Sequence, residues 1–266
     1  MECVPLDEHS WLCENTLMQR LELTLATPAE NVALDEALLD WAETQPGGRE
    51  FLRIWESPEP MVVVGRSTRI AQEVDLAECQ RQGVPVIRRS SGGAAIVAGP
   101  GCLMYAVVLS YEKRPDLRDI TRAHCFVLDR LIEALGPLLA ASTKLTRAGT
   151  CDVVLTQNSF DSARKFSGNS LRVKRTHCLY HGTLLYNFDL KLLETCLRLP
   201  PRRPEYRESR SHLEFVHNVP LTRRQLIEAL DTAWPTSGRL ADPPLNLVKD
   251  LVRERFGLKP WNEEFA

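Results

Sequence analysis

The order of helix-like and strand-like segments is the feature of this chain that most constrains its fold. A capping box at Thr27-Pro28-Ala29-Glu30 opens a predicted helix that continues through Trp41. A second stretch, residues 116–135, repeats apolar side chains at helical spacing and stops at Gly136-Pro137. Short β-prone runs predict strands at 51–55, 61–65, 84–87, 103–109, 151–155, 164–173 and 178–188. Because strands and helices do not alternate as in a doubly wound fold, we predict an α+β fold with a mixed or antiparallel central sheet flanked by helices.

The remaining segments predict one short helix and a helical C-terminus. Residues 75–82 are expected to form the short helix, and residues 223–233 and 245–256 the two C-terminal ones. A proline-rich run at 200–204 is the strongest candidate for a linker, but it falls inside what reads as one unit. We therefore predict a single domain over residues 1–266.

Charge and cysteine content argue against several classes of protein. The formal net charge is −2, from 33 basic and 35 acidic residues, which disfavours a surface built throughout for nucleic acid. The eight cysteines are scattered, without a C-x-x-C pair or zinc-ligand spacing, so neither a metal site nor a disulfide framework is expected. No stretch approaches the roughly 20 apolar residues of a membrane span, and no secretory signal is recognised. These features predict a cytoplasmic protein with free thiols.

A glycine-rich turn with two arginines is the first candidate for a binding site. The segment Arg88-Arg89-Ser90-Ser91-Gly92-Gly93-Ala94-Ala95 follows the strand expected at 84–87. Glycines let the backbone approach a ligand and turn its N–H groups inward, while arginines fork onto carboxylate or phosphate oxygens. The turn is therefore a candidate anion site, with an ordinary solvated turn as the alternative.

A lysine among small residues is the second candidate. Arg164-Lys165-Phe166-Ser167-Gly168-Asn169-Ser170 is followed by His181-Gly182-Thr183-Leu184-Leu185. In the expected strand, the small residues beside Lys165 leave space for a ligand whose developing negative charge the ammonium would stabilise. The alternative is a solvated strand lysine.

The two segments together resemble the lipoate-protein ligase and octanoyltransferase family, relatives of the biotin ligases, over roughly residues 20–220. The motifs that carry the resemblance are, in chain order, Asn31-Val32-Ala33-Leu34-Asp35-Glu36-Ala37-Leu38-Leu39, Val63-Val64-Gly65-Arg66, Arg88-Arg89-Ser90-Ser91-Gly92-Gly93, Cys151-Asp152-Val153-Val154, the Lys165 segment and the His181 segment. Their shared order is the strongest part of the match. Residues 221–266 would then be a helical extension of the catalytic domain.

The resemblance implies an enzyme that attaches lipoate, or its octanoate precursor, through an amide to a lysine of a lipoyl carrier domain. In the ligase branch, ATP with Mg2+ first converts the acid to an acyl-adenylate, which the carrier lysine attacks. Lys165 would hold the acyl carbonyl and phosphate oxygens. The residues implied to bind substrate are Arg89, Ser91, Gly92, Gly93, Ser167, Gly168, His181 and Gly182. No protein metal ligand is implied.

Departures from the ligase signature open a second mechanism. Ala94 stands where the signature has a third glycine, and Ala98 where one octanoyltransferase branch has histidine. Another octanoyltransferase branch has a nucleophilic cysteine shortly before the invariant lysine, and Cys151 precedes Lys165 by a similar interval. Its thiolate would take octanoate from an acyl carrier protein thioester and pass it on without ATP or another cofactor. The alternative for Cys151 is a small buried strand residue.

Other interpretations of these residues stay open. A non-catalytic relative that binds the acid or a lipoyl domain is compatible with the altered glycine motif, although Lys165 argues for chemistry. Asp152 either supports Lys165 electrostatically or is an ordinary strand-edge aspartate. A nucleic-acid binder would use the basic residues Arg164, Lys165, Arg172, Lys174, Arg175, Arg202, Arg203, Arg207 and Arg210. These charges are mixed with acids and lack interleaved aromatic residues, so a solvated face or a dock for an acidic carrier domain fits better.

Overall fold

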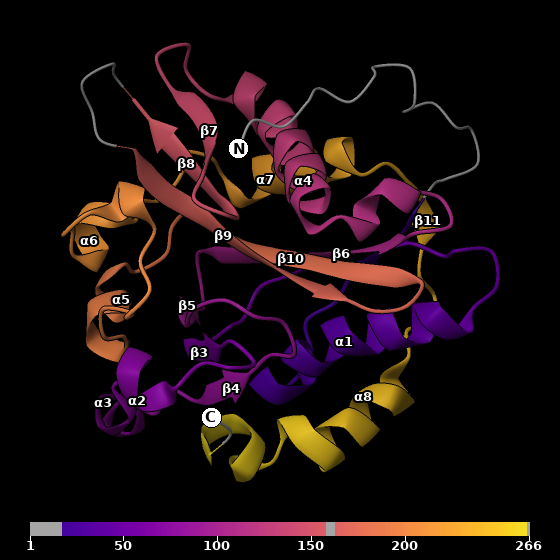
Figure 1. Cartoon of the computed structure of the whole chain (residues 1–266), viewed down its shortest axis with the longest axis horizontal. Helices are drawn as coiled ribbons and strands as arrows, with labels where there is room; N and C mark the ends of the chain where they lie inside the picture. The colour runs from indigo at the N-terminus through magenta and orange to yellow at the C-terminus, as the bar shows by residue number, and fades with distance from the viewer. Residues whose placement is uncertain (1–17, 158–162, 265–266) are drawn as a thin grey trace.

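The computed structural model describes residues 18–157 and 163–264, and its main feature is a mixed sheet of eight strands (Figure 1). The strand order is β11-β1-β2-β6-β10-β9-β8-β7. Its strands are β1 (Met18–Glu22), β2 (Phe51–Trp55), β6 (Cys102–Ser110), β7 (Lys144–Ala148), β8 (Asp152–Thr156), β9 (Arg164–Val173), β10 (His177–Leu185) and β11 (Thr236–Arg239). Strand β1 runs parallel to both of its neighbours, and the other pairs are antiparallel. The predicted α+β class with a mixed sheet is confirmed.

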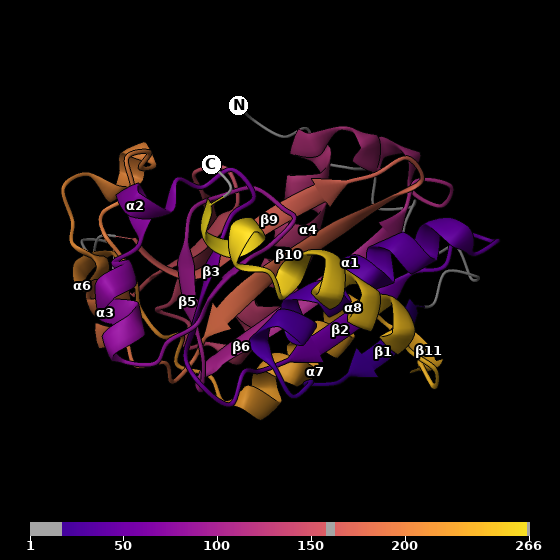
Figure 2. The ribbon, with the colours of Figure 1, turned by 90° about the horizontal axis from the view of Figure 1, so that it is seen from below.

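A second, three-stranded sheet carries the glycine-rich turn. It has the order β4-β3-β5, formed by β3 (Met61–Val64), β4 (Val86–Arg88) and β5 (Ile96–Ala98). Strand β3 is parallel to β4 and antiparallel to β5. The turn between β4 and β5 is thereby held beside the centre of the larger sheet, on the face that α1 covers (Figure 2).

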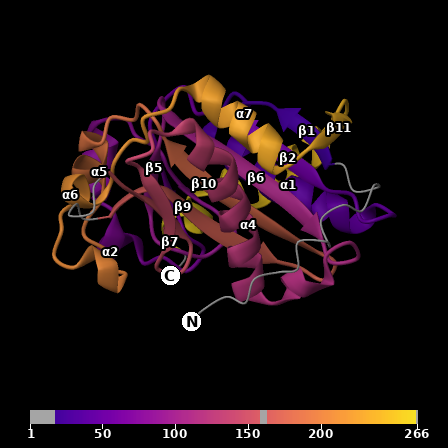
Figure 3. The ribbon, with the colours of Figure 1, turned by 90° about the horizontal axis from the view of Figure 1, so that it is seen from above.

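Helices cover both faces of the large sheet. On one face lie α1 (Pro28–Thr44) and α8 (Leu245–Leu251), which pack on each other. On the other lie α4 (Ile120–Leu135) and α7 (Arg223–Ala233), also in mutual contact (Figure 3). Each layer encloses its own apolar core against the sheet. The capping box predicted for α1 is present, because Thr27 and Glu30 each accept a hydrogen bond from the other's backbone N–H.

Several short elements escape the sequence prediction. They are the strands β1, β5, β7 and β11 and the short helices α2 (Ile70–Glu73), α5 (Lys191–Cys196) and α6 (His212–Phe215). The missed strands have three to five residues, too few for a period-2 pattern to stand out, and β7 and β11 are largely polar edge strands. The short helix predicted at 75–82 is observed as α3 (Leu76–Arg81). The helix predicted at 245–256 is α-helical only to Leu251 and then widens into a π turn over Val252–Phe256.

The C-terminal residues pack against the small sheet. The indole Nε1 of Trp261 donates to the carbonyl oxygen of Arg88 at 2.9 Å, and the backbone N–H of Arg88 donates to Oδ1 of Asn262 at 2.9 Å. Strand β4, which leads into the glycine-rich turn, is therefore fixed by residues more than 170 positions later in the chain.

The structure bears on the predictions about membrane spans and free thiols. No helix within the described ranges is long and apolar enough to cross a membrane. Among the residues that the structure describes, the free thiols are Cys79, Cys102, Cys151, Cys178 and Cys196. Cys125 is disulfide-bonded, so the prediction of free thiols is wrong for that residue.

Candidate active site

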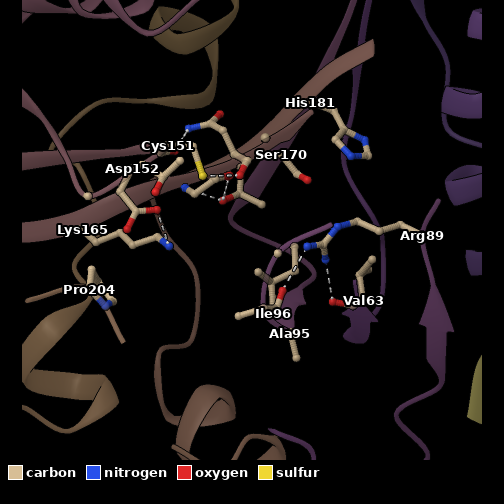
Figure 4. A pocket seen from close by; sticks show the side chains of 18 of the residues that line it. Val63, Arg89, Ala95, Ile96, Cys151, Asp152, Lys165, Ser170, His181 and Pro204 are labelled. Atoms are coloured by element: carbon tan, nitrogen blue, oxygen red, sulfur yellow. Dashed lines mark hydrogen bonds and ion pairs between the residues drawn. The ribbon is translucent and has the colours of Figure 1, made fainter. Parts of the chain in front are cut away.

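A cavity of about 620 Å³ lies where the glycine-rich turn faces strands β9 and β10. Its apolar lining includes Val32, Trp55, Val63, Ile96 and Met104. Figure 4 shows Cys151, Asp152 and Lys165 on one side of the cavity, and Arg89 and His181 on the other. The cavity thus combines an apolar slot with a small set of charged and nucleophilic groups, which is typical of a ligand site.

The two arginines of the turn do not face outward as a free anion fork. The buried guanidinium of Arg88 donates to the carbonyl oxygens of Gly65 at 2.7 Å and Thr68 at 3.0 Å, and its Nε donates to Trp261. Gly65 and Thr68 belong to the loop after β3, and Trp261 belongs to the C-terminal segment, so one guanidinium satisfies carbonyl oxygens of two segments. The prediction that both arginines are available to carboxylate or phosphate oxygens is therefore wrong for Arg88, whose role is to join loops.

Arg89 lines the cavity but is also committed to the backbone. It donates to the carbonyl oxygens of Val63 at 3.1 Å, Gly92 at 2.5 Å and Ala94 at 3.1 Å. Burial lowers the pKa of Arg89 to about 10. Gly93 lies within this loop at φ +90°, where a Cβ atom would come 2.9 Å from Nη2 of Arg89. The guanidinium therefore shapes the turn, and substrate binding by Arg89 stays a prediction.

Lys165 forms an ion pair on the opposite wall. Its Nζ lies 2.7 Å from Oδ1 of Asp152, and the hydroxyl of Tyr206 donates to Oδ2 of the same carboxylate at 2.7 Å. All three side chains line the cavity. Burial and the neighbouring Asp152 charge raise the pKa of Tyr206, so it stays protonated and acts as a donor. The electrostatic support of Lys165 by Asp152, one of two alternatives in the sequence, is confirmed.

The Tyr206 hydroxyl is expected to hold Asp152, and through it Lys165, in position. In Tyr206→Phe, one hydrogen bond to a charged group is lost, and we expect the rate of the reaction catalysed at this site to fall about tenfold. Tyr186→Phe is the matched control, because the Tyr186 hydroxyl donates to Glu56 at 2.9 Å and does not line the cavity. Steady-state kinetics on both variants measure the effect. Equal rates in the two variants would contradict a positioning role for Tyr206.

Cys151 lies immediately before β8 and lines the same cavity. It is half-buried, and its Sγ–H donates to the carbonyl oxygen of Asn169 at 2.8 Å. Asn169 is itself fixed by the hydroxyl of Tyr105, which donates to its Oδ1 at 2.5 Å. Burial raises the pKa of Cys151, and the Asp152 charge adds to this, while the Lys165 charge opposes it. The resting group is therefore a thiol held toward the cavity with a cation close by.

His181 belongs to a hydrogen-bonded chain that reaches deep into the fold. Its Nε2 lies 2.6 Å from Oγ of Ser91, and its Nδ1 lies 2.9 Å from Oδ2 of Asp35 on α1. Asp35 also pairs with Arg53 at 2.6 Å, which is fully buried. Burial by itself would raise the pKa of Asp35, but the Arg53 charge and the His181 hydrogen bond hold it below its ordinary value. This chain fixes the orientation of the imidazole in the cavity wall.

The cavity brings together most of the residues that the sequence singles out. Those that line it are Arg89, Gly93, Cys151, Lys165, Gly168, His181 and Gly182. Ser91 and Ser167 are buried behind the wall, and Gly92 is exposed outside it. Their proposed contacts with substrate stay predictions.

Three residues of the site were not predicted from the sequence, namely Asp35, Asn169 and Tyr206. Asp35 carries a signal in retrospect, because it is an acid within the apolar run of α1 and follows Asn31 by one helical turn. Tyr206 carries none, since its partner Asp152 is 54 positions away. No group of three or more His, Cys, Asp or Glu side chains that could hold a metal ion occurs in the part of the chain that the structure describes.

Comparison with known proteins agrees with this geometry. The family profile described as the lipoyl protein ligase A/B catalytic domain matches residues 27–229. The octanoyltransferase LipM of Brevibacillus brevis is 24% identical over 264 residues, covering 89% of this chain and 95% of the relative. LipM of Geobacillus kaustophilus is 26% identical over 263 residues, covering 88% of this chain and 94% of the relative.

Solved structures share the fold. A bipartite lipoate protein ligase from Thermoplasma acidophilum superposes with a TM-score of 0.76 at 22% identity, covering 94% of this chain and 98% of that one. A lipoate-protein ligase A bound with ATP gives a TM-score of 0.74 at 20% identity, covering 94% of this chain and 100% of that one. The profile match spans more than half of the chain and includes the cavity, so the chain belongs to the lipoyl protein ligase A/B catalytic domain family.

Proposed function

We propose that this protein transfers octanoyl groups from a thioester donor to a lysine of a lipoyl carrier domain, through an acyl intermediate on Cys151 and without ATP. The observation that carries the proposal is the placement of Cys151 and Lys165 on one wall of a single cavity (Figure 4). The apolar lining of the cavity suits an alkyl chain. The near full-length similarity to octanoyltransferases supports the same choice.

The proposed reaction has two balanced steps. In the first, the sulfur of Cys151 attacks the octanoyl carbonyl carbon, the bond from that carbon to the donor sulfur breaks, and the donor thiol leaves with the proton that Cys151 gives up. In the second, the ε-amine of the carrier lysine attacks the thioester carbonyl carbon, the bond from that carbon to the sulfur of Cys151 breaks as the amide forms, and the sulfur takes up a proton that the amine gives up. Lys165 stabilises the oxyanion that develops in each step.

The ATP-dependent ligase reaction is the second candidate. The observation that favours it is that Lys165 faces the turn around Ala95 across the cavity, where an acyl-adenylate would fit (Figure 4). Against it stand the engagement of both arginines with backbone carbonyls and the presence of Ala94 in place of a third glycine. With fewer free donors for phosphate oxygens in the turn, the thioester route is the better fit.

A mass measurement on the acceptor separates these functions. The protein is incubated with an apo lipoyl domain and either octanoyl-acyl carrier protein, or octanoate or lipoate with ATP and Mg2+. We expect an octanoyl adduct on the lipoyl domain from the thioester alone. An adduct that forms only with ATP would assign the ligase reaction instead. No adduct from either mixture, with the acid or the lipoyl domain still binding, would assign a non-catalytic binder.

A further inference from the structure

Four arginines follow α5 within nine residues. They are Arg202, Arg203, Arg207 and Arg210. Two acids, Glu205 and Glu208, lie in the same segment, and Glu205 also lines the cavity. In the described part of the chain, the ion pairs include none of the four. Because the four arginines outnumber the two glutamates of the segment and form no ion pair with them, the segment carries a net positive charge that attracts an anion.

Two of the four arginines, Arg207 and Arg210, are held in place by contacts within the protein. Arg207 is buried over the ring of Phe215, with its guanidinium carbon 4.7 Å from the ring centroid, and its Nη2 has no hydrogen-bond partner among the described residues. Arg210 donates to the carbonyl oxygen of Ala163 at 2.8 Å. Burial lowers the pKa of Arg207, and the charges of Arg203 and Arg210 lower it further. The positive charges therefore lie close enough to repel one another.

The other two arginines, Arg202 and Arg203, lie where the cavity opens to solvent. Arg202 and Arg203 are exposed, yet both line the same cavity as Cys151 and Lys165. They have no hydrogen bond or ion pair within the described ranges. Their charge is therefore available to a ligand, unlike the guanidinium groups of the glycine-rich turn.

The segment that carries them is anchored beside the nucleophile. Tyr206 is hydrogen-bonded to Asp152, the residue after Cys151. Gly149 faces the segment so closely that a Cβ there would lie 3.3 Å from Pro204 and 3.4 Å from Tyr206. Figure 4 shows Pro204 beside Lys165, at the edge of the cavity. A ligand that places its reacting carbon at Cys151 would leave the cavity past Arg202 and Arg203.

We propose that Arg202 and Arg203 bind the phosphate of the acyl donor, the phosphate of a phosphopantetheine arm whose thioester is presented to Cys151. This inference rests on the proposed function. Arginine matches phosphate oxygens with paired N–H donors, and the acceptor lysine brings no phosphate of its own. The arginine pair therefore selects the donor in the first step and has no contact to make with the acceptor amine in the second.

The test compares two donors that differ only in the phosphate. Single-turnover acylation of Cys151 is followed by intact-protein mass with octanoyl-pantetheine and with octanoyl-4′-phosphopantetheine, each below saturation. We expect the phosphorylated donor to react about tenfold faster with the unmodified protein. In the variant Arg202→Ala/Arg203→Ala, the two donors should react at the same rate. The control Arg175→Ala/Arg239→Ala removes two exposed positive charges elsewhere and should keep the preference.

The outcomes distinguish the phosphate-binding role of Arg202 and Arg203 from the proposed octanoyl transfer through Cys151. Equal rates for both donors in the unmodified protein, or a preference that survives in Arg202→Ala/Arg203→Ala, would overturn the inference and leave the proposed function standing. Octanoyl-acyl carrier protein serves as a third donor. If the variant Arg202→Ala/Arg203→Ala reacts more slowly than the unmodified protein with this donor alone, the arginines bind carboxylates of the carrier protein, and the phosphate role is overturned. No acyl group on Cys151 from either donor would refute the proposed function itself. In that case, product that requires ATP and is lost in the variant would assign the arginines to ATP phosphates.

Discussion

Replacing Cys151 with alanine is expected to abolish octanoyl transfer from a thioester donor, with a loss of about a thousandfold or more. The variant lacks the sulfur that would carry the acyl group between donor and acceptor. The acyl-enzyme should therefore be absent from intact-protein mass spectra, and the lipoyl domain should stay unmodified. Because the Cys151 side chain is half-buried and packs at a strand entrance, the fold should tolerate the smaller residue.

Cys102→Ala is the control for that experiment. Cys102 is fully buried, and burial raises its pKa above the range in which it could react. The Cys102→Ala variant should therefore still be acylated on Cys151.

In the unmodified protein, burial raises the pKa of Cys151, so the thiolate fraction and the acylation rate should still be rising at pH 9. If the Cys151→Ala variant transferred octanoyl groups at the normal rate, an acyl intermediate on Cys151 would be ruled out.

Replacing Lys165 with alanine is expected to slow transfer by a factor of about 100 to 1,000. The change removes the cation that faces the cavity and that opposes the rise in the pKa of Cys151. It also leaves Asp152 without its ion-pair partner. Both half-reactions should slow, because an oxyanion forms in each. Rapid-quench measurement of Cys151 acylation and of amide formation reports the two steps separately.

Two variants make the Lys165 result interpretable. Lys174→Ala removes a lysine that pairs with Asp40 just beyond the far end of β9, and it should transfer at the normal rate. Lys165→Arg keeps the charge with a different shape, and it should recover part of the rate. If Lys165→Ala transferred as fast as the unmodified protein, Lys165 could not be the group that stabilises the oxyanion.

The sequence predicted the elements and residues whose signals are local. The capping box of α1, the long β9 and β10 strands, and the motif residues Cys151 and Lys165 all depend on neighbours within a few positions. Periodicity and capping act over that same distance, so these predictions could be read from the chain. The short edge strands are different, because pairing with distant segments stabilises them more than their own composition does.

The parts of the site that the sequence could not predict come from contacts between distant residues. His181 meets Asp35 across 146 positions, and no local pattern announces that pairing. The direction of a guanidinium group is equally invisible, so Arg88 and Arg89 read as ligand groups although backbone carbonyls bind them. Among the described residues that line the cavity, Arg202 and Arg203 have neither a hydrogen bond nor an ion pair, and they lie in the proline-rich run that the sequence marks as a candidate linker.

The hydrogen bonds between Arg88 and the C-terminal residues make one wall of the cavity sensitive to a truncation far from it in sequence. Strand β4 is held by Trp261 and Asn262, which bond to the backbone carbonyl oxygen and the backbone N–H of Arg88. A chain cut after Lys259 keeps every residue that lines the cavity but loses these partners. The glycine-rich turn that follows β4 should therefore exchange its amide protons faster in the truncated chain than in the full one.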